Sequence, residues 1–176
     1  MTQAMIRAKP LNLSTLLEQH ALLPSQPRAV ALLSSELRQL EPGMRSLVQL
    51  FSTDPVLTAR MLAVANGPVH QLAQRVHSIP EALVVLAPVQ LRQLVQKSAP
   101  TGATHTQGGW SLAGFWRYSL DTARIARALA MSVQANASAA YTLGLLHGLG
   151  QLLLRTADPE TFVRLAELLE PMHPKR

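Results

Sequence analysis

The 176-residue chain has no cysteine and few aromatic residues. Without cysteine it can form neither a disulfide nor a metal site with thiolate ligands. Aromatic residues make up only 4% of the chain, so Leu, Ala and Val must fill most of any core. Because β-branched and aromatic residues are scarce while Leu, Ala, Gln and Arg are common, the composition favours helices over strands.

The sequence also lacks an apolar run long enough to span a bilayer. The longest run, from Leu143 to Leu154, is interrupted by His147 and Gln151. The first ten residues do not contain the apolar stretch of a signal peptide. We therefore expect a soluble, cytoplasmic protein that does not bind a membrane.

Charged residues are few, at 15% of the chain, and they are unevenly balanced: sixteen Lys and Arg face ten Asp and Glu. The net charge of +6 can attract nucleic acid, acidic lipid or an acidic protein. The basic residues are scattered, however, and no run of five occurs. The charge leaves nucleic-acid binding open without favouring it.

Proline and capping residues divide the chain into short helices. Asp54 and Asp158 each precede a proline, which pairs a capping carboxylate with a residue suited to the first helical turn. Ser78 and Glu81 have the spacing of a capping box. We predict helices at about 12–20, 27–40, 43–52, 55–66, 79–86, 88–97, 111–131, 137–155 and 159–170, with a loop at 98–109. The fold class is therefore all-α, a compact multi-helix bundle in which 1–176 form a single domain.

The predicted helix 111–131 has two contrasting faces. Small or apolar residues recur at helical spacing on one of them: Leu112, Phe115, Ser119, Ala123, Ala126 and Ala130. Arg117, Asp121 and Arg124 lie opposite, and the simplest interpretation is a solvated face with ion pairs around Asp121. The alternative is a partner-binding surface formed by Arg117, Arg124 and Arg127 near Trp116.

The predicted helix 137–155 is apolar nearly all round, which indicates central burial. Gly144, Gly148 and Gly150 each lower helix propensity by about 1 kcal/mol relative to Ala. We expect glycine here because a neighbouring helix approaches closely. His147 lies among these glycines.

His147 is the first candidate for metal binding or proton transfer. A metal site needs about three protein ligands, and no acidic residue occurs between Asp121 and Asp158. The simpler interpretation is a core histidine hydrogen-bonded to a backbone carbonyl or hydroxyl. We therefore predict no metal, no cofactor and no catalytic residue.

Other candidates for chemistry are weaker. The remaining histidines are scattered along the chain, at 20, 70, 77, 105 and 173, and we expect them to be exposed. No Gly-x-Ser-x-Gly, Walker-type or Gly-x-Gly-x-x-Gly motif occurs. Asp54 is interpreted as a helix cap, and Asn66, which precedes Gly67, as a C-terminal cap.

Four blocks of sequence occur in a recognisable order. They are LLPSQPRAV at 22–30, DPVLTARMLAVAN at 54–66, VHSIPEALVVL at 76–86, and FWRYSL at 115–120 paired with GLLH at 144–147. Together the blocks cover about residues 22–155, and they resemble the HDOD family, the HD-related output domains of bacterial signalling proteins. The resemblance implies an all-helical, HD-like bundle.

The chain departs from the family where the wider HD superfamily binds metal. Tyr118 stands where His is common, and Gly148 stands where the HD aspartate would follow His147. Glycine offers no ligand atom from a side chain, so the resemblance implies a vestigial site rather than an active one. Family members usually continue further, so we expect the C-terminal part to be shortened or absent here.

The resemblance implies a non-catalytic bacterial regulatory module that acts by binding another protein, a signalling component. Some relatives are linked to cyclic-dinucleotide signalling. Two alternatives stay open: a metal-dependent HD-type phosphohydrolase, and a helical domain that binds nucleic acid. The sequence determines neither the partner nor the oligomeric state.

Overall fold

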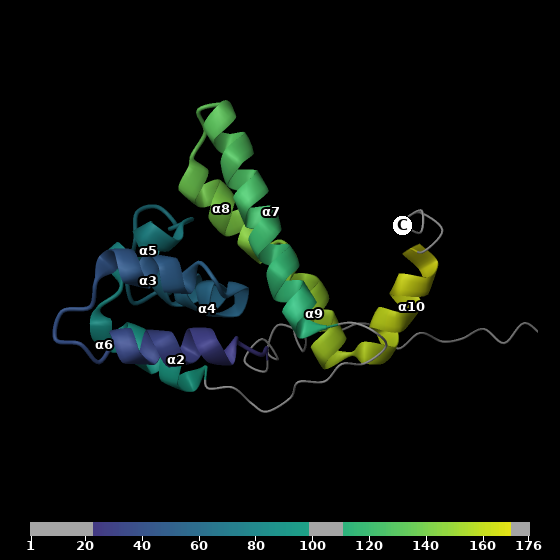
Figure 1. The fold of residues 1–176 in the computed structure, drawn as a ribbon, viewed down its shortest axis with the longest axis horizontal. Helices are drawn as coiled ribbons and strands as arrows, with labels where there is room; N and C mark the ends of the chain where they lie inside the picture. Colours follow the sequence, from purple (N-terminus) through teal and green to yellow (C-terminus); the bar gives the residue numbers. More distant parts are fainter. Residues whose placement is uncertain (1–22, 99–110, 170–176) are drawn as a thin grey trace, which may run out of the picture. The chain divides into compact units, whose positions relative to one another are not determined.

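The computed structural model describes residues 23–98 and 111–169, and every regular element in these two ranges is an α-helix (Figure 1). The helices are α2 (Pro27–Glu36), α3 (Met44–Phe51), α4 (Pro55–Ala65), α5 (Ile79–Val85), α6 (Pro88–Lys97), α7 (Leu112–Ser132), α8 (Ala137–Leu146), α9 (Leu149–Ala157) and α10 (Pro159–Leu169). The all-α prediction is confirmed. Within the described ranges, no helix combines the length and apolar character needed to cross a membrane.

Three helix starts follow the predicted capping side chains, at Asp54, Ser78 and Asp158. The predicted helix 88–97 matches α6 at both ends. The predicted helix 27–40 was too long, because α2 ends at Glu36 and the backbone N–H of Leu37 closes its last turn on Leu33. The predicted helix 12–20 and nearly all of the predicted loop 98–109 lie outside the described residues.

The prediction of one helix over 137–155 was wrong, because the chain forms two helices there. Helix α8 ends at Leu146 and α9 begins at Leu149. His147, between them, keeps helical backbone angles of φ −54° and ψ −34°. Gly148 and Gly150 each disfavour helix by about 1 kcal/mol relative to Ala, which accounts for a break at this point.

The caps form as expected with one difference. The Asp54 carboxylate accepts hydrogen bonds from the backbone N–H groups of Val56 and Leu57, at 2.8 and 2.9 Å. Asp158 caps α10 in the same way. At α5, Ser78 accepts from the Glu81 N–H, but the Glu81 carboxylate accepts from the N–H of His77, at 2.9 Å. The predicted capping box therefore reaches one residue further back along the chain.

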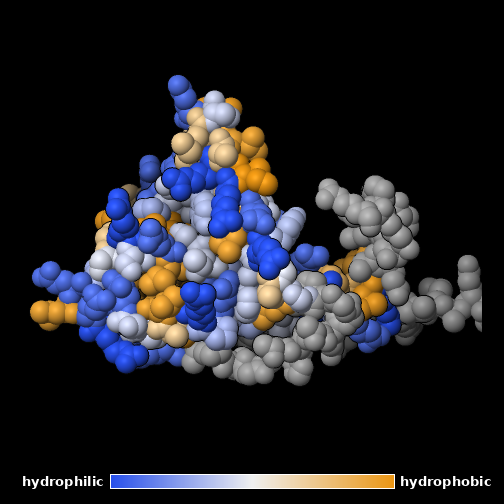
Figure 2. All heavy atoms as spheres, in the orientation of Figure 1, coloured by the Kyte–Doolittle hydropathy of each residue, from blue (hydrophilic) through white to orange (hydrophobic). Residues whose placement is uncertain are grey.

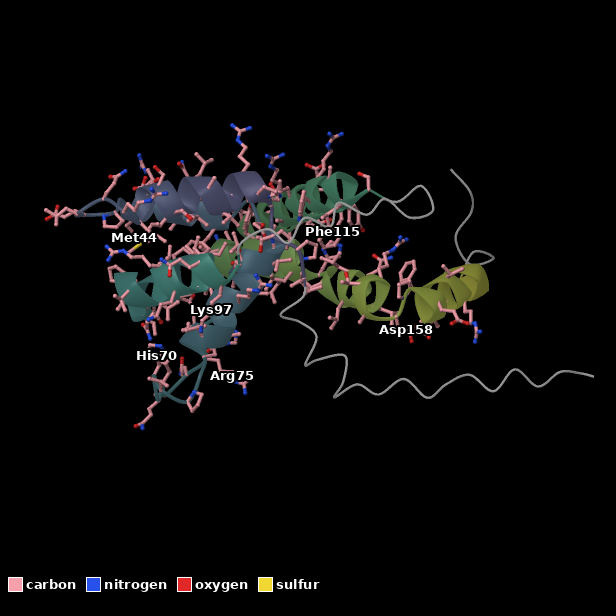
Figure 3. All side chains as sticks on the ribbon, turned by 90° about the horizontal axis from the view of Figure 1, so that it is seen from below. Met44, His70, Arg75, Lys97, Phe115 and Asp158 are labelled. Atoms are coloured by element: carbon pink, nitrogen blue, oxygen red, sulfur yellow. The ribbon has the colours of Figure 1, made fainter. Side chains whose placement is uncertain are left out.

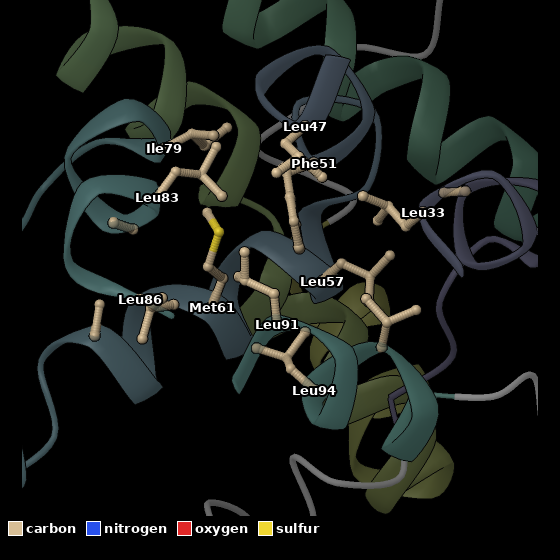
Figure 4. Close-up of a cluster of buried hydrophobic side chains, with 14 of the residues drawn as sticks. Leu33, Leu47, Phe51, Leu57, Met61, Ile79, Leu83, Leu86, Leu91 and Leu94 are labelled. Carbon is tan, nitrogen blue, oxygen red and sulfur yellow. The ribbon is translucent and has the colours of Figure 1, made fainter. Parts of the chain in front are cut away.

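The hydrophobic core lies among α2 to α6 (Figure 4). Phe51, Leu57 and Met61 are completely buried in it. Ala123 of α7 and Leu145 of α8 belong to the same cluster. Helices α7 and α8 form an antiparallel hairpin, and these two residues attach the hairpin to the bundle.

The chain divides into two compact units. One is Pro24–Gly150, and the other combines Met1–Leu23 with Gln151–Arg176. In the second unit, the Arg155 guanidinium carbon lies 3.8 Å from the centre of the Phe162 ring, a cation–π contact. The contacts that join the segments of the four sequence blocks all lie within Pro24–Gly150.

Candidate functional site

Asp54 joins the first two sequence blocks. Its side chain is completely buried, and besides capping α4 it accepts a hydrogen bond from the backbone N–H of Gln26. The Gln26 amide in turn donates to the Thr53 carbonyl at 2.9 Å. Burial raises the pKa of the Asp54 carboxyl, against the opposing effects of these N–H donors and of Arg60. Asp54 is thus a structural clamp, in agreement with its interpretation as a cap.

Asn66 joins the second block to the third. It is the C-cap of α4, as predicted. Its side-chain amide also donates to the Val76 carbonyl at 2.9 Å and accepts from the Val76 N–H at 2.8 Å. This pairing closes the loop that carries His70 and Arg75, which extends away from the helices in Figure 3. Sequence reasoning missed this role, because the partner backbone lies ten residues away.

Helix α8, which carries the GLLH part of the fourth block, contacts two earlier segments through side chains just before that part. Thr142 Oγ1 accepts from the backbone N–H of Ile79, in the third block, at 3.3 Å. The Tyr141 hydroxyl donates to the carbonyl of Ser52, two residues before the second block, at 3.0 Å. The segments that carry the four blocks are therefore connected to one another.

The structure brings His147 and Tyr118 together, with ring centres 5.0 Å apart. His147 Nδ1 lies 2.7 Å from the Gly144 carbonyl oxygen. Because a carbonyl only accepts, Nδ1 must carry a proton in this bond, and Nε2 is the nitrogen able to accept. The predicted bond to a backbone carbonyl is confirmed, but the predicted core position was wrong. His147 is exposed, since it lies just beyond the end of α8, and Tyr118 is 60% exposed.

Gly148 is buried, and Phe115 fills the space beside it. A Cβ atom at position 148 would lie 3.0 Å from Phe115 Cε2, closer than nearly all real Cβ contacts. No cluster of three or more His, Cys, Asp or Glu that could hold a metal occurs in residues 23–98 and 111–169. His147 and Tyr118 therefore place one imidazole beside a phenol, facing solvent.

The other two glycines behave differently from each other. A Cβ at Gly144 would lie 2.9 Å from Ala123 Cα and 3.0 Å from the Thr122 carbonyl oxygen. The predicted close helix approach is thus confirmed at Gly144. The prediction of a close helix approach was wrong at Gly150, because nothing lies within 4 Å of a Cβ added there.

The residues of the predicted partner surface on α7 differ in their exposure. Arg117, Arg124 and Arg127 are all exposed, whereas Trp116 is half-buried. Among the described residues, the buried indole Nε1 of Trp116 finds no hydrogen-bond partner. Arg124 pairs with Asp121 at 3.2 Å, which confirms the expected ion pair. Of the predicted inner face, Phe115, Ser119, Ala123 and Ala130 are buried, whereas Leu112 and Ala126 are half-buried.

The remaining histidines form no site in the part of the chain that the structure describes. His70 Nε2 lies 3.3 Å from the Gln90 side-chain nitrogen, and His77 is exposed. The other three histidines, at 20, 105 and 173, lie outside the described residues.

Comparison with known proteins identifies the family. The HDOD domain model matches residues 23–174. The crystal structure of the MmoQ response regulator from Methylococcus capsulatus is similar, with 28% identity and a TM-score of 0.69, over 85% of this chain and 64% of that chain. A comparison with curated proteins gave no match.

Two further solved structures share sequence similarity with this chain. A putative phosphohydrolase from Shewanella amazonensis is 31% identical, with a TM-score of 0.41, over 92% of this chain and 58% of that chain. An HDOD domain protein of unknown function from Geobacter sulfurreducens is 25% identical, with a TM-score of 0.35, over 90% of this chain and 61% of that chain. The chain thus spans less than two thirds of the length of these solved proteins. Because the family match covers most of the sequence, the chain belongs to the HDOD family.

Proposed function

We propose that this chain is a non-catalytic signalling module that acts by binding another protein. The observation that carries the proposal is the packing at Gly148. The position that would supply the HD aspartate has no side chain, and the Phe115 ring stands where one would enter. His147 alone provides far fewer than the about three protein ligands of a catalytic metal site.

The signalling role is supported by similarity. MmoQ, whose fold resembles this one at a TM-score of 0.69, is described as a response regulator. HDOD relatives in bacterial signalling act as output modules, and we propose the same role here, in the cytoplasm. The exposed arginines of α7, Arg117, Arg124 and Arg127, are the polar part of the surface that would contact a partner.

The proposal is tested by restoring the missing carboxylate with Gly148→Asp. We expect this variant to unfold at a lower temperature than wild type, because a carboxylate would be buried beside Phe115 without a partner, at a cost of several kcal/mol. Gly148→Ala is the control, since it adds the Cβ without the charge. We expect it to be destabilised less, and neither variant should gain phosphodiesterase activity.

Metal content and turnover decide between this function and a metal-dependent phosphohydrolase. The protein should be purified without a histidine tag, analysed for Fe, Mn, Ni and Zn, and assayed with bis(p-nitrophenyl) phosphate. We expect substoichiometric metal and no turnover. Stoichiometric metal together with turnover that His147→Ala abolishes would overturn the non-catalytic proposal.

Binding to duplex DNA addresses the nucleic-acid alternative. Phosphate contacts from Arg117, Arg124 and Arg127 would give an affinity that falls steeply with salt. The ion pair of Arg124 with Asp121 places a carboxylate within this group of arginines, which opposes phosphate binding. We expect no salt-dependent DNA binding, and its appearance, with loss in Arg117→Glu/Arg124→Glu, would favour the alternative.

A further inference from the structure

The loop between α4 and α5 is held at two points. At its base, Asn66 pairs with the backbone of Val76. Further along the loop, His70 Nε2 lies 3.3 Å from Gln90 Nε2 of α6. Within residues 23–98 and 111–169, this is the one hydrogen bond that joins residues 68–75 to a helix. We propose that His70 and Gln90 form a pH-sensitive latch, which holds the loop on α6 while the imidazole is neutral and releases it on protonation.

The direction of the latch hydrogen bond is determined by the first turn of α6. Gln90 Oε1 accepts from the backbone N–H of Ala87 at 3.0 Å. A reversed amide would place its NH₂ group against that N–H, so that two donors would face each other. Gln90 therefore donates through Nε2, and His70 Nε2 accepts. An imidazole nitrogen accepts only without a proton, so the latch requires a neutral His70 with its proton on Nδ1.

Protonation of His70 removes this acceptor. Both nitrogens of an imidazolium are donors, so the Nε2–H group would face the NH₂ group of Gln90. Gln90 cannot turn its oxygen toward His70 without leaving the Ala87 N–H at the start of α6 without a partner. The positive end of the α6 dipole also disfavours a cation beside its first turn. Histidine changes charge between about pH 5 and pH 8, which is where the latch would respond.

The surrounding elements offer little to stabilise a cationic His70. Helix α4, the loop and α6 contain no acidic residue. Glu81 of α5 is the acidic residue nearest in sequence, and its carboxylate accepts from the backbone N–H of His77 at 2.9 Å. The other charged or titratable side chains on these elements are all basic: Arg60 on α4, Arg75 and His77 in the loop, and Arg92 and Lys97 on α6.

Backbone strain next to His70 favours opening once the latch is lost. Gln71 has a φ of 43°, in the left-handed region that few residues other than glycine adopt. Such a conformation persists where surrounding contacts over-determine it. Here the Asn66–Val76 pairing fixes the base of the loop, and the latch fixes the residue before Gln71 (Figure 3). Loss of the latch lets Gln71 relax, so we expect the loop to leave α6.

A spin label in the full chain reports the state of the loop. Ala73→Cys places the label on an exposed loop residue, and the chain has no other cysteine to react. We expect electron paramagnetic resonance to show the population with a mobile label increasing about fivefold or more from pH 8 to pH 5, the effect of losing one hydrogen bond. A label at Gln96→Cys, exposed on α6, is the control and should not change. Thermal unfolding checks that the protein is folded at both pH values.

Three variants, each carrying the label at position 73, identify the titrating group. His70→Gln supplies an amide oxygen that accepts at any pH, so the loop should stay closed at both values. Gln90→Glu keeps an acceptor for the Ala87 N–H and offers a carboxylate oxygen to His70. Because that oxygen binds an imidazolium more strongly than a neutral ring, the pH dependence should reverse. His77→Gln removes the other histidine of the loop and should behave like wild type.

The state of the ring gives an independent measurement. Long-range ¹H–¹⁵N spectra of the imidazole at about pH 8 should show the His70 proton on Nδ1, as the latch requires. A proton on Nε2 at that pH would overturn the latch. So would a label whose mobility is the same at both pH values in wild type, opening at pH 5 that persists in His70→Gln, or opening that disappears in His77→Gln.

Discussion

The α2–α6 bundle and the α7–α8 hairpin make their closest inner contacts with side chains of different size. In the bundle, large side chains fill the core, and Phe51, Leu57 and Met61 have no exposed surface. In the hairpin, the closest contact between the two helices is made by Ala123 and Gly144, while Ile125 and Leu129 face solvent. Figure 2 shows hydrophobic residues gathered over the side of the hairpin near its tip. Both parts belong to the same compact unit.

This difference separates residues that maintain the fold from residues available for binding. Burying a large apolar side chain contributes about 1.5–3 kcal/mol to folding, which the bundle obtains from Phe51, Leu57 and Met61 and the hairpin does not obtain from Ile125 and Leu129. The polar residues show the same contrast. Asp54 is buried and clamps two blocks together, whereas Asp121 and Arg124 pair on the surface. The bundle therefore obtains stability from side chains of a kind that the hairpin leaves exposed at Ile125 and Leu129.

The largest expected difference between the two parts comes from truncating a large side chain in each. Phe51→Ala should reduce the free energy of unfolding by about 3–5 kcal/mol, because it leaves a cavity in the core. Ile125→Ala should change it by no more than about 0.5 kcal/mol. Urea denaturation of the two variants measures both. Similar losses would mean that Ile125 is buried in the folded protein and the contrast is false.

The packing of the hairpin is tested by adding one methyl group. In Gly144→Ala the new Cβ meets backbone atoms of α7, which cannot rotate away, so we expect a loss of about 1–3 kcal/mol. Gly150→Ala is the matched control, because its Cβ meets nothing and Ala favours helix by up to about 1 kcal/mol. Equal stability of the two variants in urea would show that α7 and α8 are less closely packed.

The buried carboxylate of Asp54 predicts a pH effect specific to the bundle. Its pKa is raised by burial in the folded state, so the native protein binds this proton more tightly than the unfolded chain does. The contribution of Asp54 to stability is therefore fully present below its ordinary pKa of 3.8 and is lost as the pH rises through the raised value.

Comparison with Asp54→Asn isolates this effect from other titrations. The variant should be less stable overall, since its amide NH₂ would face a backbone N–H donor. The advantage of wild type over the variant, measured in urea at a series of pH values, should shrink as the pH rises from below 3.8. If the advantage of wild type instead grew as the pH rises, the N–H donors would lower the pKa of Asp54 by more than burial raises it.

The smallest effect is expected for the surface ion pair of Asp121 and Arg124. Their side chains are 54% and 70% exposed, so solvent screens the attraction. A double-mutant cycle with Asp121→Ala and Arg124→Ala should give a coupling of about 0.3–0.5 kcal/mol, decreasing with added salt. A coupling that is large and insensitive to salt would place the pair in a less exposed setting.

Much of the fold follows from local signals in the sequence. Proline after Asp54 and Asp158, and the spacing of apolar residues along 111–131, predict helix positions because capping and periodicity depend on near neighbours. The break at Gly148 was missed. Glycine favours both close packing and helix interruption, and residue spacing does not distinguish between them.

The site was less predictable for a related reason. The absence of a carboxylate after His147 could be read from the sequence, as could the small-residue face of 111–131. Ile125 and Leu129 could also be read from the sequence as an apolar pair at i, i+4 outside that face. Its exposure could not be deduced, because an apolar residue on either face of a helix can be buried by another element.

The sequence by itself determined the all-helical class, the capped helix starts and the loss of the HD aspartate, because each depends on residue type or short spacing. Only the tertiary structure decided that Asn66 pairs with Val76, that Phe115 occupies the space beside Gly148, and that His147 faces solvent. These facts depend on which segments meet. That choice is made by the packing of the whole chain, in which burial of distant residues outweighs local preference.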